Sequence, residues 1–304
     1  MPNSQVAGGS ETGRSPERRL STLPLSGRRR WTNRIMHAAM FATVILVLIP
    51  VVMILFQIAQ KGLGTMSWEF LTQSMPLSFR RAGGGFVNAL IGTLIMVGLA
   101  TLISVPLGIL AAIYLVEYGK KNAFAQVIRF FSDVMTGVPS VFVGLFVYTA
   151  MVVNIGFGAL LGGLSLAIIM LPIITRSTEE MLKLVPRELK DASYALGAAK
   201  WQTVLRVVLP TAAPGISTGV MLAIARAAGE TAPLILTAFG AYNIVTALVD
   251  APISALPLAL YNGARNPFPA GQARAWAGAL ELLVLVLVLT QAARITSSRS
   301  KIQR

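Results

Sequence analysis

Several apolar runs are long enough to cross a lipid bilayer, and this feature limits the fold more than any other. A transmembrane helix needs about 20 predominantly apolar residues. Of the 304 residues, 55% are hydrophobic and only 12% are charged. The sequence therefore predicts an all-α integral membrane protein. We expect six transmembrane helices, at residues 35–58, 86–116, 138–153, 155–174, 211–228 and 277–293.

The distribution of Lys and Arg predicts how these helices are oriented. Cytoplasmic loops of membrane proteins are enriched in Lys and Arg. Twenty of the 26 basic residues lie in the N-terminal tail, around residues 120–129, in the stretch 176–206 or in the C-terminal tail. We therefore place both termini and the loop 176–210 in the cytoplasm. This topology also explains the formal charge of +14 without a nucleic-acid partner.

The alternation of polar and apolar stretches predicts the organisation of the chain. The first apolar run exceeds the roughly 7–15 residues of a signal-peptide core, so we expect a retained helix. The stretch 231–271 contains five prolines and is expected to bend and then form a structured outer loop. The predicted parts are a cytoplasmic basic tail with the composition of a disordered segment (1–34), a first transmembrane helix (35–58), an outer loop (59–85), a transmembrane core (86–293) that contains the loop 176–210, and a cytoplasmic tail (294–304).

The chain lacks the residue patterns of an enzyme. It contains no cysteine and a single histidine, His37, which we expect to be structural. It has no G-x-x-x-x-G-K-[ST] segment that could cradle the phosphates of ATP. Neither a nucleophilic triad nor a pair of catalytic carboxylates is evident. We therefore expect a membrane subunit with no catalytic residue, no metal site and no cofactor of its own.

The stretch 186–210 is too patterned for a passive connector. Pro186 suits the start of a helix, and Leu189, Ala192 and Leu196 then fall on one helical face. Gly197 tolerates a positive φ and suits a tight turn. A second amphipathic helix is expected to follow and to end at Pro210. Such a hairpin can lie on lipid headgroups or dock on a soluble partner. The charged residues expected on its outer faces are Arg187, Glu188, Lys190, Asp191, Lys200 and Arg206.

A charged pair is predicted inside the membrane. Arg226 follows Pro210 by 16 residues, which is about 24 Å along a helix and within a hydrocarbon core of roughly 30 Å. Glu230 is four residues further and shares its helical face. The pair can be an internal salt bridge. It can also be an anion site, because the guanidinium is a fork of donors suited to phosphate or sulfate oxygens, and Glu230 can accept a hydrogen bond from protonated phosphate.

Two further polar features accompany the apolar runs. Gly137-Val138-Pro139-Ser140 interrupts the third run, because proline frees a backbone carbonyl. Ser140 can then line a path or merely satisfy the kink. Arg129 and Asp133 are spaced as an i, i+4 pair, which we expect to be an interfacial salt bridge.

The loop resembles the cytoplasmic "EAA" loop of ABC importer permeases. That pattern reads E-A-A, three residues, Gly, nine residues, I-x-L-P. Here Asp191, Ala192 and Ser193 stand for E-A-A, Gly197 follows at the required distance, and V-V-L-P closes the pattern at 207–210. The departures are Asp for Glu, Ser for the second Ala and Val for Ile.

Three other segments resemble the phosphate permease (PstA) branch of that family. They are R-A-x-G-E-T-A-P-L at 226–234, G-V-P-S-V-F-V-G-L-F at 137–146 and L-P-L-A-L-Y at 256–261. The resemblance covers about residues 86–293. It implies the type I ABC importer permease fold and a permease subunit of an ATP-driven importer of inorganic phosphate, in a bacterial cytoplasmic (inner) membrane.

The resemblance also implies partners and site residues. The partners are a paralogous (PstC-like) permease subunit, two (PstB-like) ATPase subunits that carry ATP and Mg, an extracytoplasmic (PstS-like) phosphate-binding protein, and membrane lipid. The loop would lie in a groove of an ATPase subunit. The residues assigned to the substrate pathway are Arg226, Glu230, Thr231 and Ser140, and those assigned to ATPase coupling are Glu188, Asp191, Ala192, Leu196, Gly197, Ala198 and Ala199.

Three competing functions fit parts of this sequence. A permease for sulfate, molybdate or an organic solute would share the loop but not the segment 226–234. An ion-coupled secondary transporter or channel would need no ATPase, so co-purification of an ATPase subunit separates it from an importer. If the protein were a membrane scaffold without transport, a charged residue at the depth of Arg226 would have no role.

Overall fold

The computed structural model describes residues 27–119 and 122–299. The chain divides into two compact units, residues 1–55 and 56–304, which we describe separately. Within the described ranges the chain is helical between its connections, and its one extended pairing is an isolated bridge between Phe239 and Ile253. This agrees with the predicted all-α class.

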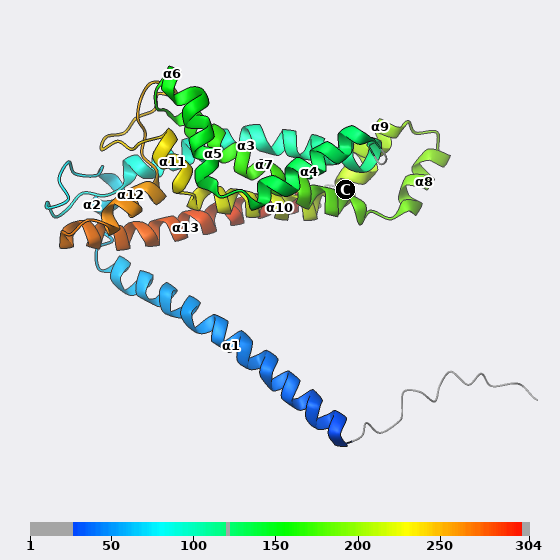
Figure 1. Cartoon of the computed structure of the whole chain (residues 1–304), viewed down its shortest axis with the longest axis horizontal. Helices are drawn as coiled ribbons and strands as arrows, with labels where there is room; N and C mark the ends of the chain where they lie inside the picture. Colours follow the sequence, from blue (N-terminus) through cyan, green and yellow to red (C-terminus); the bar gives the residue numbers. More distant parts are fainter. Residues whose placement is uncertain (1–26, 120–121, 300–304) are drawn as a thin grey trace, which may run out of the picture. The chain divides into compact units, whose positions relative to one another are not determined.

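The first unit contains most of a single long helix. Helix α1 (Gly27–Leu63) begins in this unit and ends in the second (Figure 1). None of its most apolar stretch is buried, so its apolar surface suits lipid or another chain. The helix begins eight residues before the predicted start at Ile35, because the arginines at 28–30 continue the helix. The rest of the predicted basic tail, residues 1–26, lies outside the described residues.

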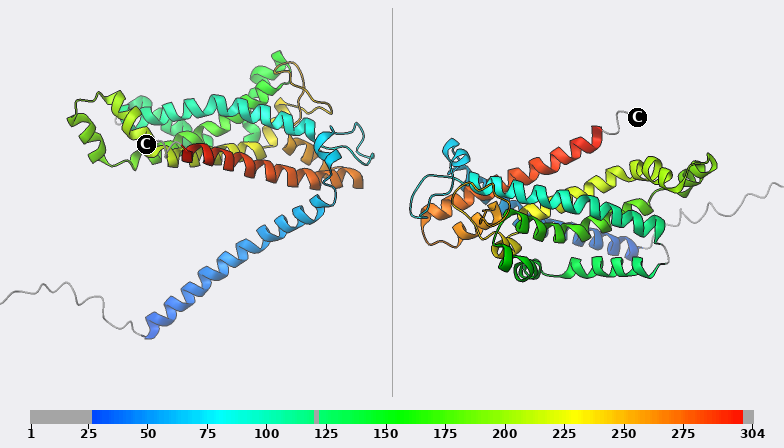
Figure 2. Two further views of the ribbon diagram at one scale, coloured as in Figure 1. Left: turned by 180° about the vertical axis from the view of Figure 1, so that it is seen from behind. Right: turned by 90° about the horizontal axis from the view of Figure 1, so that it is seen from above.

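The second unit is a helical bundle with a loop at one end. Figure 2 shows α8 and α9 at one end, which we call the loop end, and α2, α11 and α12 at the opposite end. Its helices are α2 (Trp68–Thr72), α3 (Val87–Ile113), α4 (Ala123–Gly137), α5 (Ser140–Val147), α6 (Val153–Ile155), α7 (Ala159–Lys183), α8 (Arg187–Ala195), α9 (Lys200–Thr203), α10 (Leu209–Gly229), α11 (Ala232–Thr237), α12 (Leu256–Ala264) and α13 (Pro269–Arg299), with π-helical turns η2 (Tyr114–Tyr118), η3 (Tyr148–Val152) and η4 (Val204–Val208).

Across the described ranges, five helices are long and apolar enough to cross a membrane, and a bent pair can supply a sixth. The bent pair consists of residues 123–137 and 140–155, whose axes differ by 109°. The predicted third helix, 138–153, therefore corresponds only to the second arm of this pair. The break lies at Pro139, which has no N–H to continue the ladder of helical hydrogen bonds.

Helix α7 is the centre of the bundle. Two thirds of its apolar stretch, 67%, is buried, and it packs against α3, α4, α5 and α10. Close approach to α3 depends on glycine, because a Cβ at Gly163 would lie 2.9 Å from Leu99 Cβ and 3.2 Å from the backbone carbonyl oxygen of Met96. Small residues at helix contacts are the usual means of close packing in membranes. The buried core here includes Met96, Leu166, Met170 and Ile174.

The fifth spanning helix is continuous from Lys200 to Gly229. The prediction that a helix ends at Pro210 is therefore wrong. The π turn η4 explains the difference: the N–H of Leu209 donates to the carbonyl of Val204, five residues back. A local π adjustment of this kind re-satisfies backbone groups around a proline, so the helix passes through Pro210.

The region 231–271 bends and then forms a structured loop, as predicted. It contains α11, an irregular stretch and α12. The loop between α2 and α3 is fixed to α13 by Arg274. This arginine is buried and donates to the carbonyls of Phe79, Arg81 and Gly83. These contacts order the end of the bundle opposite α8.

Candidate functional site

Arg226 and Glu230 lie together at the end of α10, as their spacing predicts. The Nε of Arg226 is 3.4 Å from Oε1 of Glu230. The Arg226 side chain is 54% exposed, whereas that of Glu230 is only 15% exposed. Among the described residues, neither Nη of Arg226 has a hydrogen-bond partner. The guanidinium fork is therefore open to an oxyanion while Glu230 holds its inner edge.

The pair stands at a break between two helices. Helix α10 ends at Gly229, and Glu230 adopts an extended conformation with φ −73° and ψ 128°. Helix α11 then restarts with Pro233 in its first turn. Broken helices at membrane depth are tolerated where they line a cavity or are covered by protein, and they commonly form binding sites.

A small cavity brings Arg226 and Ser140 together. It lies where the α4–α5 break meets α7, and Met135, Thr136 and Pro172 also line it. Its volume is about 30 Å³, and a cavity needs about 10–15 Å³ for each water molecule that it holds. In this conformation the enclosed space is too small for an oxyanion with four oxygens. An anion would reach Arg226 from its exposed side or after the bundle opens.

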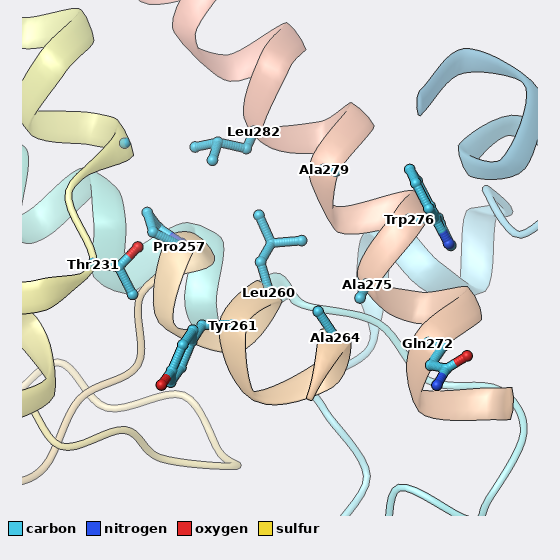
Figure 3. A pocket seen from close by; sticks show the side chains of 11 residues that line it. Thr231, Pro257, Leu260, Tyr261, Ala264, Gln272, Ala275, Trp276, Ala279 and Leu282 are labelled. Atoms are coloured by element: carbon cyan, nitrogen blue, oxygen red, sulfur yellow. The ribbon is translucent and has the colours of Figure 1, made fainter. Parts of the chain in front are cut away.

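A larger pocket borders the break between α10 and α11. It measures about 590 Å³ and is lined by Gly229, Thr231, α12 and α13. Figure 3 shows Thr231 and Tyr261 on one side and Gln272 and Trp276, both from α13, on the other. The predicted pathway residues are thus divided, because Thr231 lines this pocket while Ser140 lines the small cavity.

Tyr261 and Gln272 were not among the predicted site residues. Tyr261 belongs to the L-P-L-A-L-Y segment, but nothing in that segment indicated a cavity. Gln272 lies three residues after the start of α13, where a polar residue is ordinary. Only the packing of α12 against α13 places both side chains at the pocket.

The loop 186–210 folds as helix, turn, helix. Helix α8 starts directly after Pro186, and Gly197 has φ +81° in the turn before α9. From 186 to 202 no residue is buried. Leu196 is 90% exposed and Trp201 is 56% exposed. A projecting surface with such large apolar side chains is typical of a site that another protein covers.

The residues predicted to couple to an ATPase gather on this loop. Ala198 is half-buried, and all the others are exposed: Glu188, Asp191, Ala192, Leu196, Gly197 and Ala199. The prediction that every charge of the loop faces outward is wrong for Lys190 and Lys200. The side chain of Lys190 turns inward to the carboxylate of Glu117, and Lys200 donates to the carbonyl of the same residue. The sequence pattern of the loop could not reveal this, since Glu117 is 73 residues away.

The predicted pair between Arg129 and Asp133 does not form. Arg129 Nε instead donates to Oε1 of Glu179 at 2.9 Å, and Lys183 contacts the same oxygen at 2.7 Å. Glu179 is 1% exposed. A buried carboxylate gains more from a cation than an exposed one does. Asp133 lies on the surface, 3.9 Å from Arg176.

Comparison with known proteins identifies the family. Residues 104–302 match the model of the binding-protein-dependent transport system inner membrane component. The phosphate transport system permease protein PstA of Yersinia pestis is 42% identical, with 90% of this chain and 92% of that protein covered. PstA of Haemophilus influenzae is 39% identical, with 90% and 96% covered.

Solved structures show the same fold at low identity. A bacterial ABC transporter that imports alginate matches with a TM-score of 0.62 and 20% identity over 89% of this chain and 99% of that chain. The alginate transporter in complex with its pentasaccharide-bound periplasmic protein matches with a TM-score of 0.65 and 18% identity, over 88% and 95%. The chain has the fold of a type I ABC importer permease, and it belongs to the PstA family of the binding-protein-dependent transport system inner membrane components.

Proposed function

We propose that this chain is a permease subunit of an ATP-driven importer of inorganic phosphate and forms half of its translocation pathway. One observation carries the proposal. A guanidinium with two open Nη atoms stands at a helix break within the spanning bundle, in a chain whose relatives are named phosphate transport system permease proteins.

The chemistry at Arg226 is binding and release, with no covalent step. The guanidinium donates to phosphate oxygens, and its contact with Glu230 is long enough to yield to a better acceptor. Phosphate near neutral pH still carries O–H groups, and Glu230 accepts a hydrogen bond from one of them. Sulfate has no such proton, so the carboxylate repels it.

The transport cycle needs proteins that this chain does not supply. A paralogous (PstC-like) permease subunit completes the pathway as a heterodimer, and two (PstB-like) ATPase subunits hold ATP and Mg. An extracytoplasmic (PstS-like) phosphate-binding protein delivers phosphate, in a bacterial cytoplasmic membrane with both termini of this chain inside. ATP binding moves the loop 186–210 and opens the pathway outward; hydrolysis returns it inward.

Coupling to the ATPase is assigned to the exposed loop. The residues that contact the ATPase groove in this proposal are Glu188, Asp191, Ala192, Leu196, Gly197, Ala198 and Ala199. Their exposure supports the assignment, because an exposed apolar surface such as that around Leu196 is typical of a site that another protein binds.

The test is uptake of labelled phosphate, with excess sulfate as competitor, in cells that lack this chain. The cells are complemented with wild type or with Arg226→Lys at equal membrane abundance. Wild type is expected to restore uptake that sulfate does not inhibit. Arg226→Lys is expected to lower uptake at least tenfold, because Lys keeps the charge but lacks the planar fork of donors.

Two other outcomes would change the proposal. Equal uptake by the two variants would remove the fork-type role of Arg226 and leave only its charge. Failure of both to restore uptake would make phosphate the wrong substrate.

A further inference from the structure

The exposed loop is attached to the bundle at one buried residue, Glu117. This glutamate lies in η2, the π turn that ends α3, and is 6% exposed. Lys190 of α8 reaches it with Nζ 2.5 Å from Oε1, and the Lys190 side chain is itself only 15% exposed. Although α8 contains no buried residue, this ion pair brings one of its side chains to a buried carboxylate.

Lys200 of α9 binds the same residue through the backbone. Its Nζ donates to the carbonyl of Glu117, and it also lies 4.4 Å from the centre of the Tyr118 ring. The loop is closed on itself by the hydroxyls of Ser193 and Thr203, which are 2.9 Å apart. Both helices of the loop are therefore tied to one turn of α3.

The π turn makes these carbonyls available. The last carbonyls of any helix have no donor within the helix, and cations are favoured at that end. Here the N–H of Gly119 closes the turn on the carbonyl of Tyr114. The carbonyl of Leu115 then accepts from Nη2 of Arg129 on α4 at 3.0 Å. Three cations from α4, α8 and α9 thus converge on η2.

These contacts connect α8 to the bundle through side chains as well as along the backbone. Along the backbone, α8 is connected only to α7 and, through α9, to α10. Through Glu117 it is also attached to α3, and through Leu115 and Arg129 to α4. The far end of α4 is the break at 138–140, which borders the cavity that Arg226 and Ser140 share.

We propose that Glu117 is a positioning residue for coupled transport, holding α8 and α9 on the end of α3 so that movement of the loop displaces α3 and α4. The inference rests on the proposed function, since it assumes that α8 receives its movement from an ATPase. Without the ion pair, movement of α8 reaches α3 and α4 only indirectly, through α7 and α9, and we expect less phosphate to be transported per ATP hydrolysed.

The experiment uses the complete transporter in proteoliposomes, with the phosphate-binding protein present. Phosphate uptake and ATP hydrolysis are measured on the same preparation, and their ratio is compared between variants. Glu117→Gln and Lys190→Gln are each expected to lower the amount of phosphate transported per ATP about tenfold. A factor of this size corresponds to the free energy of one charge-assisted hydrogen bond. ATP hydrolysis itself is expected to persist.

Two controls separate this role from loss of structure. Glu180→Gln makes the same substitution at an exposed glutamate of α7, whose side chain is 57% exposed, and is expected to leave the ratio unchanged. The double variant Glu117→Gln with Lys190→Gln is expected to match the single variants, because both remove one contact. It also leaves no unpaired buried charge, so it carries the test if Glu117→Gln alone does not assemble.

The possible failures are distinguishable. If the wild-type complex shows no ATP-dependent phosphate uptake, the proposed function is wrong and this inference falls with it. If wild type transports and the assembled Glu117 variants keep the wild-type ratio, the inference alone is overturned.

Discussion

At the scale of single residues, the proposed function gives Arg226 and Glu230 different parts in the recognition of an oxyanion. Arg226 is open to its surroundings, and Glu230 is held inward at the helix break. The arginine attracts any oxyanion, so discrimination falls to the carboxylate. A protonated oxyanion can donate to Glu230, whereas a fully deprotonated one meets only repulsion.

Glu230→Gln is therefore expected to weaken discrimination against sulfate while preserving phosphate uptake. A hydrogen bond to a charged group is worth about 1.5–3 kcal/mol, so the sulfate concentration that halves phosphate uptake should fall about tenfold or more. The measurement is competition by sulfate in uptake assays. Glu180→Gln serves as the control, because Glu180 lies at the loop end and far from Arg226 and Glu230. Unchanged competition by sulfate in Glu230→Gln would argue that Arg226 and Glu230 form a purely structural pair.

The pairing of charges shows where sequence reasoning succeeds and where it stops. Arg226 and Glu230 pair as their i, i+4 spacing predicts. Arg129 does not pair with Asp133 at the same spacing, because Glu179, 50 residues away, offers a buried carboxylate. Lys190 likewise turns to Glu117. Local spacing predicts an ion pair only when no residue distant in the sequence offers a more buried partner.

At the scale of elements, the turn in the loop depends on one glycine. Gly197 has φ +81°, and a Cβ there would meet nothing within 4 Å. Substitution is therefore opposed by backbone conformation alone. A left-handed conformation costs an ordinary residue roughly 1–2 kcal/mol, and asparagine tolerates it better.

Gly197→Val is expected to reduce co-purification of the ATPase subunit, because it disturbs the angle between α8 and α9. Gly197→Asn is expected to retain most of it. The measurement is the ratio of the two chains after affinity purification. Equal ratios for valine and asparagine would mean that the turn conformation does not matter for docking.

Helix α3 offers a matched pair of glycines for a packing test. A Cβ at Gly92 would lie 1.9 Å from the backbone carbonyl oxygen of Ser254, whereas a Cβ at Gly98 would meet nothing within 4 Å. Gly92→Ala is expected to destabilise the protein by about 1–3 kcal/mol through overpacking. Gly98→Ala is expected to be neutral or slightly stabilising, because alanine favours helices.

Thermal unfolding of the two variants in detergent checks this pair. Similar midpoints for Gly92→Ala and Gly98→Ala would mean that the connection before α12 can move away from α3 at little cost. A lower midpoint for Gly98→Ala alone would mean that this face of α3 is covered by a partner.

The spanning helices themselves were largely predictable, and the exceptions have local causes. Apolar runs identified five of the six spans, since length and hydropathy are sufficient. The third span differs because Pro139 breaks it into arms at 109°. The fifth differs because η4 lets the helix continue through Pro210. Periodicity cannot distinguish a proline that ends a helix from one that a π turn accommodates.

At the scale of the whole molecule, the energy source separates an ABC permease from a secondary transporter. The exposed loop with Leu196 and Trp201 is the surface that an ATPase would cover. Coupling to ATP should therefore govern uptake.

Phosphate uptake through this chain is expected to cease when cellular ATP is depleted and the proton gradient is maintained. It is expected to persist when a protonophore collapses the gradient while ATP is kept high. Uptake assays under these two conditions check the prediction. The opposite pattern would indicate an ion-coupled transporter that shares only the permease fold.

The unbroken helix from Lys200 to Gly229 has a mechanical consequence. Its 30 residues extend about 45 Å, and Arg226 lies roughly 39 Å from its first residue. A tilt of only about 10° around the α9 end would sweep the guanidinium through about 7 Å. Under the proposed coupling, a small rotation of this helix at its α9 end therefore becomes a much larger displacement of Arg226 at the other end.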